Sequence, residues 1–126
     1  YTTDFPVEQY FRESRIHPIH EGTTGIHGLD LLGRKIWMHE GLGWKKLQTH
    51  IEQTIIQAKQ EEGLNQITED FESEVKRFGQ AASEFLFKRN PDPEKFMADA
   101  SLFLEATGIV CIGWMWISQA LSAQKA

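Results

Sequence analysis

The chain has 126 residues, of which 40% are hydrophobic and 25% are charged, and its formal net charge of −5 gives a sequence pI near 5.5. This length suits one domain and is short for two, and the composition lacks the depletion of apolar residues that marks disordered chains. The acidic balance, with basic residues clustered no more densely than in pairs, argues against a dedicated nucleic-acid surface, which is normally basic.

The first predicted element is a helix that begins at Pro6 and ends by His17. Proline is favoured in the first helical turn because the N–H that it lacks would have no partner there. Asp4 or Thr3 can cap this helix start. The helix ends before Pro18 because a residue that precedes proline is pushed out of the helical region. The apolar side of the helix carries Val7, Tyr10 and Phe11.

The stretch "HPIHEGTTGIHGLDLLGRK" then places one acidic residue, Glu21, beside small residues and directly ahead of a second predicted helix. One interpretation is an ordinary helix entry, because negative charge at a helix N-terminus is stabilised by the helix dipole. Another is an anion site, in which the N–H groups of Thr24 to Ile26 receive a phosphate. The nearby His17, His20 and His27 match no zinc-binding helix pattern, so no metal site is predicted.

The second helix is expected over "GIHGLDLLGRKIWMH", capped by Thr23 or Thr24. Gly28 and Gly33 lie inside it and lower its stability, so we expect another backbone to pack closely against them. The following "HEG" reads as a helix C-terminus with a glycine cap at Gly41.

Three longer helices are predicted over residues 44–62, 64–89 and 92–123, with a break at "NPDPEK" between the last two. Apolar residues recur along each helix at spacings of three and four. The three stripes are Trp44, Leu47, Ile51, Ile55 and Ala58; Leu64, Ile67, Phe71, Val75, Phe78, Ala82 and Phe85; and Phe96, Phe103, Val110, Trp114, Ile117 and Leu121. Strand patterns are almost absent, so the predicted fold class is all-α, a bundle of antiparallel helices.

Cys111 is the only cysteine, which rules out an internal disulfide and favours a reducing compartment such as the cytoplasm. It lies within the apolar run 106–117, where a buried thiol acts as a small hydrophobe rather than as a nucleophile. This run is about half as long as a membrane span requires. It therefore predicts a buried helix and no membrane span.

The opening stretch "YTTDFPVEQYFRESRIHPIHEGTTGIHGLDLLGRK", residues 1–35, resembles the C-terminal signature of the flavin-dependent acyl-CoA dehydrogenases. That signature has an aromatic-x-x-acid-aromatic-Pro-Val-Glu start, an Arg–acid–small–basic–Ile step, and an Ile–aromatic–Glu-Gly-Thr loop before a helix that ends near Arg. Residues 42–126 resemble the extra helical segment of larger bacterial members. The resemblance therefore implies two parts: residues 1–40, the end of the dehydrogenase helical domain with its catalytic loop, and 41–126, an added helical bundle.

The resemblance also implies roles for three consecutive residues of this loop. Glu21 would be the catalytic base that removes the α-proton of an acyl-CoA thioester while a hydride passes from the β-carbon to FAD. Its backbone N–H would support the thioester oxygen together with a ribityl hydroxyl of FAD. Gly22 would allow substrate and cofactor to approach closely, and Thr23 would bind the FAD phosphate region.

Two departures from the family pattern change what can be carried over. His20 stands where relatives often have an aromatic residue that lines the acyl pocket, which leaves acyl preference open and can shift the working pH of Glu21. Gly25 stands where relatives carry a side chain that touches the cofactor, so that role is not assigned here.

The resemblance further implies a homodimer or homotetramer and an electron-transfer partner such as an electron-transfer flavoprotein. An oxidase of the same family, which returns electrons to oxygen, is the close alternative. The 126 residues contain no β-domain pattern, so we expect this piece to be inactive and without FAD on its own. An alternative of another class is a non-catalytic helical interaction module, whose partner surface would be the "GWMWISQAL" face if Trp114 or Trp116 is exposed.

Overall fold

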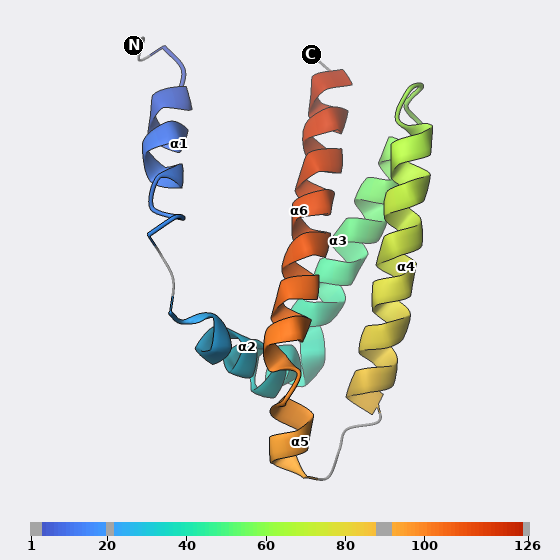
Figure 1. The fold of residues 1–126 in the computed structure, drawn as a ribbon. Helices are drawn as coiled ribbons and strands as arrows, with labels where there is room; N and C mark the ends of the chain where they lie inside the picture. Colours follow the sequence, from blue (N-terminus) through green and yellow to red (C-terminus); the bar gives the residue numbers. More distant parts are fainter. Residues whose placement is uncertain (1–3, 20–21, 88–91, 125–126) are drawn as a thin grey trace.

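The computed structural model describes residues 4–19, 22–87 and 92–124, and no strand occurs among them. The predicted all-α class is therefore confirmed. The helices are α1 (Val7–Ser14), α2 (Thr24–Gly33), the 3₁₀ segment η1 (Lys35–Gly41), α3 (Leu42–Ala58), α4 (Asn65–Phe87), α5 (Pro93–Met97) and α6 (Ala100–Gln124) (Figure 1).

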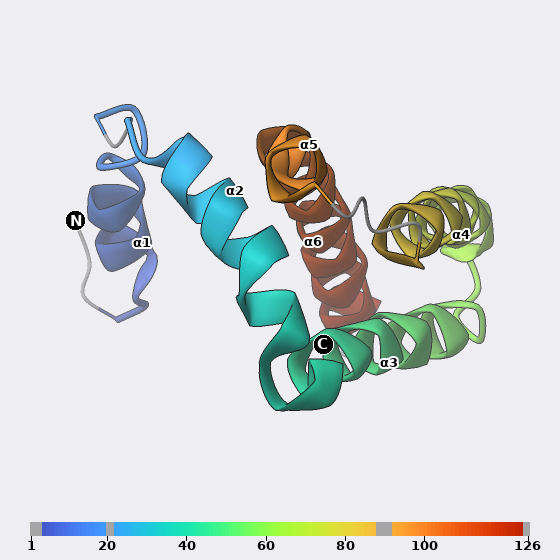
Figure 2. The ribbon, with the colours of Figure 1, turned by 90° about the horizontal axis from the view of Figure 1, so that it is seen from below.

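Three long helices, α3, α4 and α6, form the body of the molecule. The chain runs up α3, down α4 and up α6, so that consecutive long helices are antiparallel (Figure 1). Helix α2 crosses the base of α6 and leads through η1 into α3, as the view from below shows (Figure 2). Helix α1 stands apart from this body and has no buried residue.

Two hydrophobic clusters hold the body together. The first lies at the base and joins α2, η1, α4, α5 and α6; its buried members are Leu32, Ile36, Ala82, Phe96, Ala100 and Phe103. Aromatic rings extend it, with Phe85 stacked on Phe96 at 5.3 Å and Trp44 within 5.8 Å of Phe103. The second lies at the far end of α3, α4 and α6; its buried members are Ala58, Leu64, Ile117 and Leu121. The core therefore follows the apolar stripes along almost the whole length of the bundle.

The predicted stripe of α4 is wrong by one position near its start. Ile67 was expected inside but is 51% exposed, whereas Thr68 is completely buried. Leu64 and Thr68 are four residues apart and share the inward side of the first turns of α4. The hydroxyl of Thr68 has no hydrogen-bond partner in this interior. A polar residue thus occupies a position that the hydrophobic pattern assigned to its apolar neighbour.

Several predicted helix boundaries also differ from the structure. The second helix does not continue to His39, because the α-helical conformation ends at Gly33. His39 and Glu40 then adopt positive φ angles of 50° and 58°, and Gly41 follows at 76°. The predicted helix 92–123 is two helices, α5 and α6, with a turn between them. Helix α1 begins with Pro6 at the N-cap and no side-chain cap, so Asp4 does not fill that role.

The expected close approach of another backbone occurs at Gly28. A Cβ atom on this residue would lie 2.7 Å from the carbonyl oxygen of Ala100 on α6. At Gly33 the neighbour is a side chain instead, the terminal methyl of Met97, also at 2.7 Å. Gly28 and Gly33 are therefore the positions at which α2 is seated against α5 and α6.

Replacing Thr68 by valine removes a buried hydroxyl that has no partner, so we expect the free energy of unfolding to rise by about 1 kcal/mol. The same substitution at Thr107 is the matched control, because its hydroxyl donates a 2.7 Å hydrogen bond to the Phe103 carbonyl. Thr107→Val should lower the stability by about 1 kcal/mol. Urea unfolding of both variants measures the two changes in the free energy of unfolding. If both changes had the same sign, the hydroxyl of Thr68 would not be the unpaired group that the structure shows.

Candidate functional site

The loop that carries the proposed catalytic residues lies between α1 and α2. Two of its residues, His20 and Glu21, lie outside the described residues. Gly22 is described: its φ of +112° lies in the region that favours glycine, and nothing would lie within 4 Å of a Cβ there. Any side chain at Gly22 would therefore strain the backbone, although the space around it is open.

Thr23 is the N-cap residue of α2, which was one of the two predicted alternatives. Its carbonyl accepts the N–H of His27 at 2.9 Å. Its exposed side chain, however, makes no hydrogen bond to the N–H groups of the first helical turn. The hydroxyl thus stands at the positive end of α2 without the local bond that an N-cap threonine ordinarily forms.

The surroundings of this loop are apolar and open to solvent. The exposed apolar side chains on α1, on the connecting segment and on α2 include Val7, Tyr10, Phe11, Ile19 and Ile26, each at least 65% exposed. Large apolar side chains that gather at the surface mark a binding groove or a protein contact. The loop therefore lies in a region whose apolar faces are not covered within the described residues.

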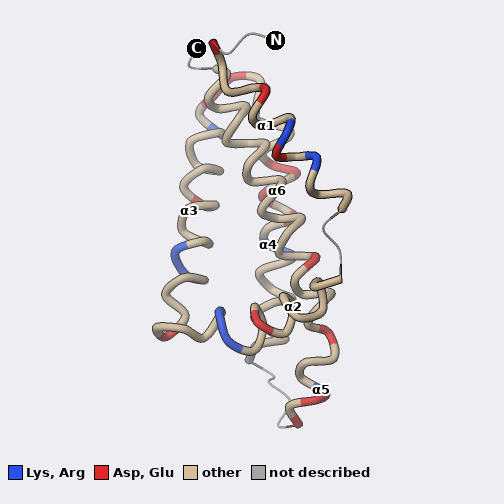
Figure 3. The backbone as a smooth tube through the Cα atoms, turned by 90° about the vertical axis from the view of Figure 1, so that its left-hand side faces the viewer, with Lys and Arg blue, Asp and Glu red and all other residues tan. Residues whose placement is uncertain are grey.

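An ion cluster lies at the other end of α2. Asp30 accepts a hydrogen bond from Arg34 at 3.0 Å and pairs with Lys35 at 3.3 Å. The Arg34 hydrogen bond is the main reason that the pKa of the Asp30 carboxyl lies below its usual value. Elsewhere charges are spread over the helices rather than gathered in one patch (Figure 3). The cluster joins the last turn of α2 to the start of η1.

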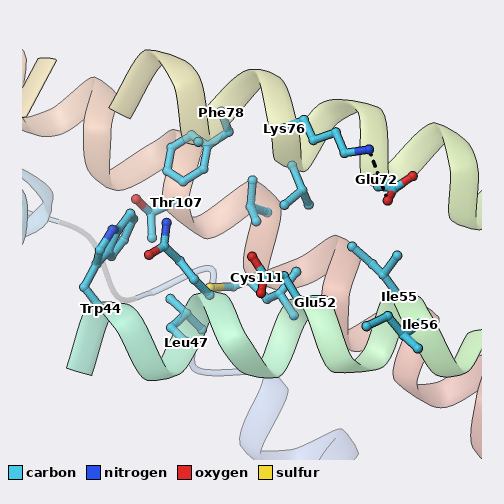
Figure 4. Close-up of a pocket in the computed structure, with 15 residues that line it drawn as sticks. Trp44, Leu47, Glu52, Ile55, Ile56, Glu72, Lys76, Phe78, Thr107 and Cys111 are labelled. Atoms are coloured by element: carbon cyan, nitrogen blue, oxygen red, sulfur yellow. Dashed lines mark ion pairs between the residues drawn. The ribbon is translucent and has the colours of Figure 1, made fainter. Parts of the chain in front are cut away.

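A cavity of about 420 Å³ lies between α3, α4 and α6 (Figure 4). Its walls are mostly apolar; they include Trp44, Leu47, Ile51, Ile55, Phe78, Val110 and Cys111. Glu72 at its edge is paired with Lys76 at 3.2 Å and with Lys59 at 2.7 Å. These two lysines lower the pKa of the Glu72 carboxyl through their hydrogen bonds. The only other carboxylate in the lining is Glu52.

This cavity has the size of a ligand pocket, and Cys111 is the one thiol in its lining. Burial raises the pKa of the Cys111 thiol, which disfavours the thiolate that would act as a nucleophile. The sequence did not reveal this cavity because its walls belong to the same stripes that predict a packed core. Cys111 is half-buried rather than buried as predicted, and its raised pKa favours the neutral thiol.

Two further properties of the described residues concern a metal site and a membrane span. Across residues 4–19, 22–87 and 92–124, no group of three His, Cys, Asp or Glu side chains is placed to hold a metal ion. One described stretch, Pro93–Gln124, is long and apolar enough to cross a membrane by length and composition alone. This stretch is longer than the apolar run 106–117, for which no membrane span was predicted. Only one side of α6 is buried, as the exposure of Ile109, Ile112 and Trp116 shows.

Comparisons with known proteins give a consistent family. Residues 47–126 match the family described as acetyl-CoA dehydrogenase C-terminal like. The chain is 31% identical over 119 residues to a 3-methylmercaptopropionyl-CoA dehydrogenase of Ruegeria pomeroyi. The aligned region covers 94% of this chain and 20% of that protein. It is 35% identical over 52 residues to a broad-specificity linear acyl-CoA dehydrogenase of Mycobacterium tuberculosis, or 41% of this chain and 8% of that protein. No solved structure matches.

The chain thus spans about a fifth or less of the length of these two relatives. The matched family segment is the helical part from α3 onward, whereas the signature that carries the resemblance lies in the first 35 residues. The match to the first relative covers almost the whole chain and therefore joins the two regions.

The lowered pKa of Asp30 makes a testable contribution to stability. A carboxyl whose pKa is lower in the folded state stabilises the fold above its unfolded pKa, and this contribution is lost as the pH falls through the folded value. We therefore expect Asp30→Asn to unfold at lower urea concentration than the parent at pH 7, with the difference shrinking as the pH falls below about 4 and vanishing only below the folded pKa of Asp30. Glu74→Gln, which breaks a solvent-exposed pair with Arg77, is the control and should show a smaller effect at pH 7. A difference for Asp30→Asn that grows towards acid pH would contradict the assignment.

Proposed function

The chain belongs to the family described as acetyl-CoA dehydrogenase C-terminal like, and from that membership we propose that it is part of a flavin-dependent acyl-CoA dehydrogenase. The observation that carries this proposal is the combination of the two regions in one chain. The signature with its Glu-Gly-Thr loop comes first, and the family segment follows it. The names of the two relatives, both acyl-CoA dehydrogenases, support the same activity.

In the proposed reaction, the Glu21 carboxylate removes the α-proton of an acyl-CoA thioester. The β-hydrogen leaves with its electron pair, and the product is the α,β-enoyl thioester. FAD, when bound, supplies the hydride acceptor. The backbone N–H of Glu21 donates a hydrogen bond to the thioester oxygen, where negative charge develops as the proton leaves. Removal of the α-proton becomes feasible because the carboxylate is held close and kept from bulk water.

The residues after the base fit a bound cofactor. Thr23 presents a hydroxyl without a capping bond at the N-terminus of α2, where the helix dipole favours phosphate. Gly22 has open space where a Cβ would otherwise point. These two residues would hold the phosphate region and admit the substrate, and His20 would line the acyl pocket beside the base.

The open apolar surfaces of α1 and α2 support a site that other parts of a longer protein complete. We therefore do not expect the 126 residues alone to bind FAD or to turn over acyl-CoA. The electron acceptor is proposed to be an electron-transfer flavoprotein in the cytoplasm. An oxidase of the same family would instead produce hydrogen peroxide with oxygen, and the peroxide yield of the full-length protein distinguishes the two.

A second candidate function is self-association through α6, and the exposure of Trp116 favours it. Trp116 is 68% exposed, whereas Trp114 is half-buried and its ring N–H donates to Thr54 at 2.7 Å. Together with Leu102, Ile109 and Ile112, Trp116 forms an outward stripe with the spacing of helix-packing surfaces. Such a stripe is self-complementary around a two-fold axis. Helix α6 has no Lys or Arg, which helices that lie on membranes usually carry.

The catalytic proposal is tested in the full-length flavoprotein. Glu21→Gln keeps the shape of the side chain but removes its basicity, so we expect turnover to fall by at least a thousandfold while bound flavin remains. Absorbance at the flavin band measures cofactor content, and bleaching of that band on addition of acyl-CoA measures the chemical step. Full activity of Glu21→Gln would refute the assigned base.

The self-association proposal predicts that Trp116→Glu converts the full-length oligomer to a smaller species in sedimentation velocity experiments. A buried charge without a partner is unfavourable at a subunit contact. Ile67→Glu, at an exposed apolar position of α4, is the matched control and should leave the oligomer intact. An unchanged oligomer in Trp116→Glu, or flotation of the parent with lipid vesicles through this face, would overturn the assignment.

A further inference from the structure

A close approach between the backbones of two helices, α2 and α6, lies one turn into the helix that follows the catalytic loop. The backbone of Gly28 lies so close to α6 that an added Cβ would be 2.7 Å from the oxygen and 2.8 Å from the carbon of the Ala100 carbonyl. Real Cβ atoms do not come this close to backbone atoms. Because the neighbour is backbone, it cannot turn aside as a side chain could.

The rest of α2 is held by the same part of the bundle. Leu32 is completely buried in the first cluster, where Phe96 and Phe103 are also buried. The backbone of Gly33 meets the terminal methyl of Met97, a half-buried side chain that packs against that cluster. Gly28, Leu32 and Gly33 therefore all rest on α5 and α6. These two helices lie beside α2 in the view from below (Figure 2).

The helix on the other side of the loop has no such support. Helix α1 contains no buried residue, and its apolar side chains Val7, Tyr10 and Phe11 are about two-thirds exposed. Of the two helices that flank the loop, only α2 is fixed to the bundle. The direction in which the chain leaves the loop is consequently set by the contact of α2 with α6.

We propose that the added helical bundle positions the catalytic loop, with Gly28 and Ala100 as the positioning residues. The proposal rests on the assignment of Glu21 as the base. Gly28 lies four residues after Thr24, about 6 Å along the helix axis from the start of α2. A forced separation at this contact must tilt α2 or shift it along α6, and either movement displaces the loop in front of it. Proton abstraction is sensitive to such displacement, since misplacement of about 1 Å can reduce a rate by about a hundredfold.

The experiment compares two glycine-to-alanine variants of the full-length flavoenzyme. Gly28→Ala places a methyl group against the Ala100 backbone. Gly108→Ala is the matched control, because it lies within α6 and its added methyl would have nothing within 4 Å. Butanoyl-CoA or octanoyl-CoA, whichever reduces the parent faster, is mixed at saturating concentration with each variant. The rate of flavin bleaching is measured per bound flavin, together with exchange of the substrate α-hydrogen into deuterated water.

We expect Gly28→Ala to slow both bleaching and α-hydrogen exchange by about tenfold or more per bound flavin, and Gly108→Ala to stay within about twofold of the parent. A purely structural role would lower the amount of folded flavoprotein without changing the rate per bound flavin. Parental rates in Gly28→Ala would therefore overturn the proposal, as would an equal loss in Gly108→Ala.

Gly33 provides a second test of the same proposal if the Gly28→Ala variant does not fold into a flavoprotein. Gly33→Ala pushes against the Met97 methyl, and we expect a severalfold slower rate that the additional change Met97→Ala restores. A parental rate in Gly33→Ala, or a loss that Met97→Ala does not restore, would count against positioning by the bundle. The outcome is separable from the proposed function: full activity of Glu21→Gln refutes the base, whereas an inactive Glu21→Gln with an unimpaired Gly28→Ala refutes only the positioning role.

Discussion

The contact between Gly28 and Ala100 is the constraint on which the arrangement of this chain depends. Helices usually pack with their axes 8–10 Å apart, because side chains fill the space between them. At Gly28 no side chain intervenes, and the backbone of α2 meets that of α6 directly. Glycine within a helix lowers its stability by about 1 kcal/mol relative to alanine. That cost is offset by the burial of Leu32, which the close approach brings into the first cluster.

The long helices could be predicted from the sequence because their stripes have one clear period. The positions that differ are those where a local conformation or a single contact prevails over that period. The α-helix after the loop ends at Gly33 rather than at His39, because Arg34 leaves the α-helical conformation with φ −128° and ψ −61°, and a 3₁₀ segment follows. The hydrophobic pattern does not encode this local change of backbone conformation. Thr68 replaces Ile67 in the interior because the geometry of the first turns of α4, not polarity, determines which position faces inward.

The candidate site shows a different limit. Physical reasoning on the residues recognised a carboxylate ahead of a helix start, but it could not separate a helix-entry residue from an anion site or a catalytic base. The choice came from the ordered family signature, not from the chemistry of one glutamate. The close contact expected for Gly28 was predicted from the residue type alone, whereas its partner Ala100 could not be, because the two lie far apart in the chain. The cavity between α3, α4 and α6 was not foreseen, since apolar walls and apolar cores have the same sequence pattern.

Helix α6 connects the two functional proposals in one rigid element. Its first residue, Ala100, supports the helix that leaves the catalytic loop, and Trp116 stands on its exposed stripe sixteen residues later, about 24 Å along the axis. Between these two points α6 is fixed against α4 at Gly113, where an added Cβ would lie 2.7 Å from the ring of Phe71. A helix that is buried along one side at both ends moves as a unit rather than bending at its middle. A second subunit that bound the exposed stripe would therefore contact the same helix that positions α2 and the loop before it. Subunit association and the position of the loop would then both depend on α6.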